Sequence, residues 1–215
     1  MSIIKKICLK LRLLTQLTFI ALLFGFSSPS FSNSSLYEKG RDFYYGNGVE
    51  QDYKKALLAF KQGSKLGDLD ALTALGIMYI VGVGVENDNE KGLEYLNDAA
   101  KQSHAKAQYY LGAMHYLGIG VTIDFDVAFK WIKLSAAQSY IFAQHNLAEM
   151  YETGKGVKQD MKTAYDYYII SAREGYVESQ VKVAEMYDKG IGTDKDLNKS
   201  KYWLKKVEES KSKKL

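Results

Sequence analysis

The chain has 215 residues, and its 47% hydrophobic content is enough to form an apolar core. Its formal net charge is +4, but residues 1–32 contain four basic and no acidic residues, so the rest of the chain is formally neutral and no basic surface for nucleic acid is expected. The single cysteine, Cys8, lies in the same segment, which excludes disulfides, a cysteine nucleophile and zinc-thiolate sites from residues 33–215.

The N-terminal segment, residues 1–32, has the three-part layout of a secretory signal peptide. Basic residues between Lys5 and Arg12 precede an apolar run from Leu13 to Phe26, and small residues follow at 30–32. The run has 14 residues, which is short for a membrane span. We therefore expect cleavage and an exported protein, periplasmic or secreted. An uncleaved membrane anchor is the alternative, and it would be the chain's sole membrane contact.

One glycine-rich loop then recurs five times, each copy 36 residues after the last and without insertion or deletion. The copies are GNGVEQD from Gly46, GVGVEND from Gly82, GIGVTID from Gly118, GKGVKQD from Gly154 and GIGTDKD from Gly190. A strict period of this length predicts a solenoid of stacked repeats. Most recurring residues are then expected to serve packing.

Each repeat is predicted to contain two amphipathic helices. An aspartate follows every loop and is expected to cap the second helix through the free N–H groups of its first turn. These caps are Asp52, Asp88, Asp124, Asp160 and Asp196. Gly67, Ser103, Ser139 and Gly175 are expected to end that helix. We predict an all-α solenoid over residues 33–210, with repeats 34–67, 68–103, 104–139, 140–175 and 176–210, and a tail over 211–215.

The repeat resembles the Sel-one-like repeat, a 36-residue relative of the tetratricopeptide repeat. In the third copy the resemblance is carried by Gln108, Leu111, Gly112 and Met114, then the loop 118–121, Asp124 and Ala128. It covers residues 33–210 and implies a right-handed superhelix and a scaffold or adaptor role, often in exported bacterial proteins. Some cysteine-rich members resemble β-lactamases in activity. This chain lacks their paired cysteines, so that activity is not carried over.

The first helix of each repeat has one face that differs between copies. The five sets are Tyr37, Arg41 and Tyr44; Thr73, Ile77 and Ile80; Tyr109, Ala113 and Tyr116; His145, Glu149 and Glu152; and Val181, Glu185 and Asp188. The equivalent face lines the groove of tetratricopeptide-like stacks. We expect it to bind an extended or helical peptide, with the tyrosines stacking and the carboxylates meeting a basic stretch.

Other interpretations of this face stay open. The tyrosines would serve packing if they contact the neighbouring repeat, and the carboxylates would be bystanders if they are solvated. An aromatic groove would also suit a glycan. The candidate partner-binding residues are Tyr37, Tyr44, Ile77, Tyr109, Tyr116, His145, Glu149, Glu152 and Glu185.

No catalytic, metal or cofactor site is predicted. His104 lies between helices, His115 takes a column otherwise held by aromatic residues, and His145 is expected at the surface rather than on a metal. The sequence therefore favours a monomeric, non-enzymatic scaffold that binds an unidentified protein or peptide in the bacterial envelope or in host contact. A cell-wall-active hydrolase or β-lactamase-like enzyme is the alternative from another class, and a purely structural spacer is a third.

Overall fold

A computed structural model describes residues 35–212 of the chain, and this part is all helical. The helices are α2 (Leu36–Tyr45), α3 (Tyr53–Lys65), α4 (Leu69–Val81), α5 (Asn89–Lys101), α6 (Ala105–Leu117), α7 (Phe125–Ala137), α8 (Ile141–Thr153), α9 (Met161–Arg173), α10 (Val177–Lys189) and α11 (Leu197–Ser212). The predicted signal peptide, residues 1–32, lies outside the described residues. Helix α11 extends to Ser212, two residues past the predicted end of the solenoid.

The recurring aspartates begin the second helix of each repeat, as predicted. Asp52, Asp88, Asp124 and Asp160 are N-caps whose carboxylates accept from backbone N–H groups of the first turn. Asp196 accepts from the N–H groups of Asn198 and Lys199 in the same way. Each cap satisfies donors that would otherwise lack a partner.

The predicted helix ends are also confirmed. Ser103 and Ser139 adopt φ values of 63° and 62°, the left-handed conformation that Gly67 and Gly175 adopt in the other repeats. This conformation closes the last turn of α3, α5, α7 and α9. The chain then enters the next repeat directly.

From the second repeat onward, the second glycine of each loop also lies close against the preceding repeat. A Cβ placed at Gly84 would lie 2.6 Å from the carbonyl oxygen of Tyr53 in the preceding repeat. At Gly156 it would collide with the carbonyl oxygen of Phe125. Gly48, in the first repeat, has open space at the same position. These glycines therefore provide close approach between repeats as well as a turn.

The core runs as a strip between the two layers of helices. Leu75, Leu111, Leu147 and Val183 recur at one depth and are at most 4% exposed. Each helix packs on the helices before and after it in the chain. Contacts of this kind produce a stack whose stability is built from neighbouring repeats.

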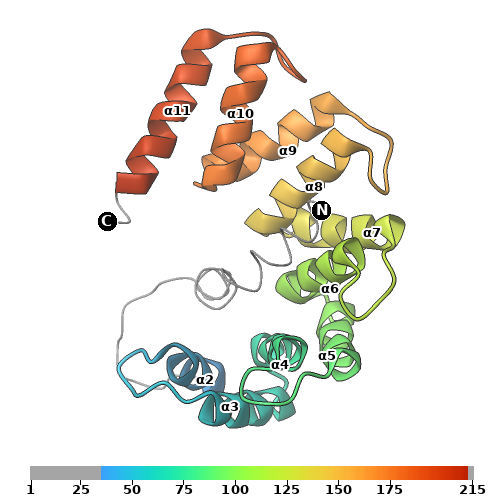
Figure 1. Ribbon diagram of the computed structural model, residues 1–215, viewed down its shortest axis with the longest axis vertical. Helices are drawn as coiled ribbons and strands as arrows, with labels where there is room; N and C mark the ends of the chain where they lie inside the picture. Colours follow the sequence, from blue (N-terminus) through green and yellow to red (C-terminus); the bar gives the residue numbers. More distant parts are fainter. Residues whose placement is uncertain (1–34, 213–215) are drawn as a thin grey trace, which may run out of the picture.

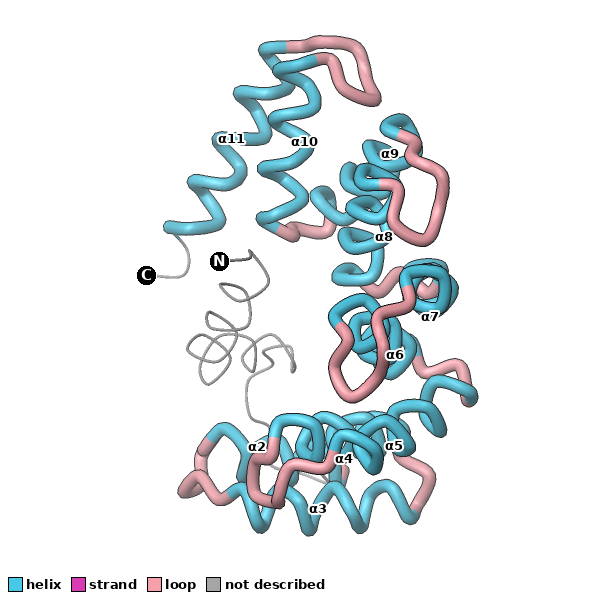
Figure 2. Tube along the Cα trace, turned by 45° about the vertical axis from the view of Figure 1, so that its right-hand side comes forward, coloured by secondary structure: helices cyan, strands magenta, loops and turns pink. Residues whose placement is uncertain are grey.

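The stack is curved (Figure 1). Helices α2, α4, α6 and α8 lie toward the inside of the curve, and α3, α5, α7 and α9 lie toward the outside. Figure 2 shows the loops between paired helices on the edge of the same arch. The predicted all-α solenoid of five two-helix repeats is thus confirmed.

Candidate interaction surface on the inner helices

We call the variable positions of the first helices the inner face. It consists of the five residue sets named above, on α2, α4, α6, α8 and α10. The structure divides these residues into two groups. Some pack against other parts of the stack, within their own repeat or in a later one, and others remain open to solvent.

Tyr37 and Tyr44, both on α2, belong to the first group. Tyr44 is only 4% exposed and packs edge-on against Tyr53, with ring centroids 5.2 Å apart. The hydroxyl of Tyr37 accepts from Lys106 Nζ at 3.2 Å, and its ring contacts Phe60. Burial lowers the pKa of Lys106 to about 8. These contacts favour the packing interpretation for both tyrosines.

Tyr109 on α6 lies within an aromatic cluster. Its ring centroid is 5.3 Å from that of Tyr110, 5.3 Å from that of Tyr140 and 6.2 Å from that of Phe142. Its hydroxyl accepts from Asn146 Nδ2 at 3.4 Å, and burial raises its pKa to about 12. The ring therefore joins α6 to the start of α8.

Tyr116, at the end of α6, is covered by the loop of the next repeat. Lys155 Nζ donates to its hydroxyl at 2.8 Å and lies 4.6 Å from its ring centroid. Phe125 packs edge-on against the same ring at 5.2 Å. A cation above a ring stabilises this arrangement, so Tyr116 also links two repeats.

His145 on α8 is half-buried rather than fully at the surface. Its Nδ1 lies 2.8 Å from Ser179 Oγ on α10, and its ring packs edge-on against Tyr176 at 4.9 Å. Burial, together with the charge of Lys182, lowers the pKa of His145 to about 4. The imidazole is thus neutral at pH 7 and serves as a polar contact between repeats.

Glu152, at the end of α8, is half-buried and has two side-chain partners. Tyr168 donates its hydroxyl proton to Glu152 Oε2 at 2.6 Å, and Lys182 Nζ lies 3.0 Å from both carboxylate oxygens. The three side chains come from α8, α9 and α10. The carboxylate is therefore half of a partly exposed ion pair between repeats.

One geometric rule underlies these contacts. The residue at the fifth position of a first helix touches the residue that precedes the next first helix. Thr73 Oγ1 lies 2.9 Å from His104 Nδ1, Tyr109 packs on Tyr140, and His145 packs on Tyr176. The residue type at this position varies between repeats, but the position always contacts the next repeat.

The open part of the inner face is acidic at its C-terminal end. Glu185 and Asp188 on α10 are exposed, and Glu149 on α8 is half-buried. Within residues 35–212 none of the three forms an ion pair. We call these three residues the acidic patch. Ile77 and Ala113, half-buried on α4 and α6, continue the face as an apolar stretch.

The described residues do not bring the histidines together. No group of three or more His, Cys, Asp or Glu side chains in residues 35–212 could hold a metal ion. His115 lies in its aromatic column, half-buried, with a buried Nδ1 that has no hydrogen-bond partner in the described part. Across the same residues, no helix has both the length and the apolar character that a bilayer crossing requires.

Sequence reasoning missed the partners of the candidate residues. The partners are lysines far along the chain. Lys106 is 69 residues from Tyr37, Lys155 is 39 residues from Tyr116, and Lys182 is 30 residues from Glu152. Each of these three lysines is replaced by other residue types at the equivalent positions of the other repeats, so periodicity carries no signal for them. The opposite charges of Glu152 and Lys182, on the first helices of adjacent repeats, are the one signal in the sequence that pointed to this pair.

These features define an α-solenoid of stacked helix pairs, in which the first helices α2, α4, α6 and α8 lie toward the inside of the curve. The chain belongs to the Sel1 repeat family, since the Sel1 repeat model matches residues 35–68, 69–104, 105–140, 141–176 and 177–206. Proteins of this family generally act as scaffolds for protein–protein interaction. A comparison with curated proteins finds no match.

Solved structures show the same fold. A protective antigen of uropathogenic Escherichia coli with an SLR fold is 31% identical, with a TM-score of 0.73 over 81% of this chain and 37% of its own. A Sel1 repeat protein from Oxalobacter formigenes is 29% identical, with a TM-score of 0.72 over 81% of this chain and 69% of its own. The chain thus spans little more than a third of the first protein.

A more distant match shows the fold alone. It is the immunity protein Pa5087 from Pseudomonas aeruginosa, 20% identical, with a TM-score of 0.60 over 81% of this chain and 67% of its own.

Proposed function

We propose that this chain is an exported, non-enzymatic scaffold whose inner face binds a segment of a partner protein in the bacterial envelope or in host contact. The proposal rests on one observation: the recurring positions are buried, whereas Glu185 and Asp188 on the inner face are exposed and unpaired within residues 35–212. An exposed carboxylate without an ion-pair partner is available to a ligand.

The charge distribution specifies the ligand. The acidic patch favours a basic stretch of the partner against α8 and α10, because complementary charge speeds encounter and fixes orientation. Ile77 and Ala113 favour an apolar stretch against α4 and α6. We therefore propose a partner segment that carries lysine or arginine at one end and apolar side chains at the other.

The test is crosslinked capture from the native envelope followed by mass spectrometry. The inner variant carries Glu149→Gln, Glu185→Gln and Asp188→Asn. The matched control carries Glu90→Gln, Glu94→Gln and Asp98→Asn on α5, where all three residues are exposed. Both variants lose the same charge. We expect the inner variant alone to lose its captured protein; equal capture by both would contradict the proposal.

Export and the absence of catalysis have separate tests. N-terminal sequencing of the protein from a periplasmic or secreted fraction is expected to show cleavage near residue 32. An intact N-terminus in the membrane fraction would instead indicate an uncleaved anchor. We expect the purified protein to leave nitrocefin and peptidoglycan unchanged, and turnover of either would contradict the scaffold role.

A further inference from the structure

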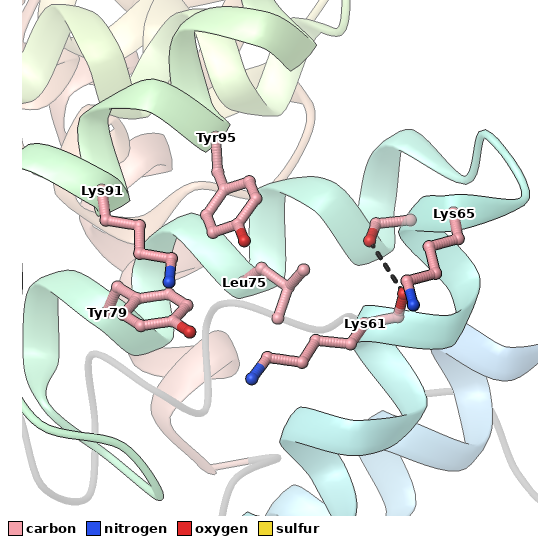
Figure 3. A pocket seen from close by; sticks show the side chains of 7 residues that line it. Lys61, Lys65, Leu75, Tyr79, Lys91 and Tyr95 are labelled. Atoms are coloured by element: carbon pink, nitrogen blue, oxygen red, sulfur yellow. Dashed lines mark hydrogen bonds between the residues drawn. The ribbon is translucent and has the colours of Figure 1, made fainter.

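A hollow of about 410 Å³ lies between α3 and α5, above α4. Its lining residues are Lys61, Ser64 and Lys65 from α3, Leu75 and Tyr79 from α4, and Lys91 and Tyr95 from α5. Figure 3 shows the side chains of Lys61, Tyr79 and Tyr95 turned toward the space between the helices, with Lys91 beside the Tyr79 ring. We call these seven residues the lysine notch.

The lysine notch is separate from the inner face. Tyr79 and Ile77 are two residues apart on α4, so their side chains point about 200° apart around the helix axis. Tyr79 packs on Tyr95 of α5, with ring centroids 5.6 Å apart. Ile77 belongs to the inner face. One helix thus contributes to two different surfaces.

The cations of the notch lack a carboxylate partner. Within residues 35–212, none of Lys61, Lys65 and Lys91 forms an ion pair. Lys91 Nζ lies 4.6 Å and Lys61 Nζ 5.9 Å from the centroid of the Tyr79 ring. Like charges held around one ring repel each other unless an anion joins them.

The positive charge of the two lysines also affects the pKa of the Tyr79 phenol. Burial opposes its ionisation, but hydrogen bonding and charge from Lys91 and Lys61 outweigh burial, and the pKa of Tyr79 falls below its ordinary value. Burial raises the pKa of Tyr109 instead, to about 12. The site around Tyr79 therefore favours negative charge.

The repeat architecture does not require this arrangement. Shifted by 36 residues, the three lysine positions become Asn97, Lys101 and Val127, then Lys133, Ala137 and Thr163, then Ile169, Arg173 and Lys199. Ser64 is replaced by alanine in all three later copies. In the last set, Lys199 is paired with Asp196. Three lysines converge only between the first two repeats.

We propose that the lysine notch binds an acidic segment of a partner protein, with the ammonium groups of Lys61, Lys65 and Lys91 and the hydroxyls of Tyr79 and Tyr95 contacting its carboxylates. The proposal deepens the proposed function, on which it rests, by adding a second docking surface of opposite charge. The hollow of the lysine notch is open, and Leu75 and the two tyrosine rings form its base. This shape suits several atoms of a peptide rather than one small ion.

The test measures binding of a fluorescent hexaglutamate peptide to the purified protein by anisotropy at low ionic strength, where surface charges are least screened. The test variant is Lys61→Gln with Lys91→Gln. The control is Lys101→Gln with Lys133→Gln, which removes the same charge at positions equivalent to Lys65 and Lys61. We expect about tenfold weaker binding for the test variant, since two charge-assisted contacts are lost, and unchanged binding for the control.

Three results would overturn the notch: no binding of hexaglutamate, equal weakening in both variants, or displacement of the peptide by equimolar inorganic phosphate, which would indicate a small-anion site. Tyr79→Phe provides a second variant that keeps the ring and is expected to weaken binding about threefold through its lost hydroxyl. Full affinity in Tyr79→Phe would contradict the assigned role of that hydroxyl.

Failure of the notch and failure of the proposed function can be told apart. If the inner variant loses its captured protein while hexaglutamate does not bind, the notch is wrong and the inner face stands. If hexaglutamate binds at the notch while the inner variant captures protein normally, the inner face is wrong and the notch stands.

Discussion

The ring of Tyr109 packs 5.3 Å from the ring of Tyr140, so a residue on the variable face of one repeat is a contact to the next. The same position holds Thr73 against His104 and His145 against Tyr176. Variation between copies at this position therefore reflects matched pairs across repeat junctions. The open inner face begins one turn further along each helix.

Removing the Tyr109 ring is expected to destabilise the stack. Tyr109→Ala should lower the free energy of unfolding by about 3 kcal/mol, because it empties an aromatic cluster. Tyr109→Phe should cost less than about 1 kcal/mol, since it keeps the ring and loses one long hydrogen bond. Urea titration measures both. If Tyr109→Ala left stability intact and abolished partner capture, the tyrosine would instead belong to the binding face.

Glycine at the second loop position is expected to matter most where a repeat precedes it. Gly156→Ala should be more destabilising than Gly48→Ala. Both substitutions incur about 1 kcal/mol or more for a left-handed φ, but only Gly156 faces the carbonyl oxygen of a preceding repeat. Thermal and urea unfolding of the two variants make the comparison. Equal effects would show that the turn alone requires glycine.

Stability should fall as pH falls from 7 to 5 through His145. Its pKa is about 4 in the folded chain and near 6.5 when unfolded, so the unfolded state binds more protons in this window. The stability contributed by the neutral ring is fully present above pH 6.5. The free energy of unfolding should be about 2 kcal/mol lower at pH 5 than at pH 7. Lys182 and Glu152 are the charges that face the ring.

The control for this pH effect is His145→Gln, which cannot titrate. Its free energy of unfolding, measured in urea at pH 7 and pH 5, should change less than that of the unsubstituted protein by about the same 2 kcal/mol. An identical pH dependence in both proteins would show that His145 is not held neutral.

Glu152 and Lys182 should be energetically coupled. A double-mutant cycle with Glu152→Gln and Lys182→Gln is expected to give about 1 kcal/mol, because the carboxylate also accepts from Tyr168. The more exposed pair Lys162–Asp166 on α9 should give a smaller coupling. High salt should reduce both values. A coupling energy near zero for Glu152 and Lys182 would show that this ion pair does not stabilise the junction between the repeats.

The sequence predicted the fold because its signals are local and repeated. Asp124 and Ser139 mark the two ends of α7 through capping and left-handed geometry, and both signals recur in register. The candidate site depended on non-local geometry. Whether Glu152 is solvated is decided by Lys182, 30 residues away, and no periodic pattern encodes that contact.

The lysine notch illustrates the same limit. Its three lysines are visible in the sequence, yet their convergence depends on how α3 and α5 meet above α4. Lysine recurs singly at these positions, as Lys133 and Lys199 show, so no single position stands out against its 36-residue equivalents. The combination of three lysines at one junction, rather than any one position, identifies the notch.

The central claim is that partner protein docks on the inner face, and site-resolved photo-crosslinking in living cells tests it most directly. A photoreactive residue is placed at Glu185 on α10 or at Asp126 on α7, since both are exposed acidic residues and Asp126 lies outside the lysine notch. We predict a crosslinked partner from position 185 and none from position 126. Crosslinks from position 126 alone, or equally from both positions, would contradict the claim.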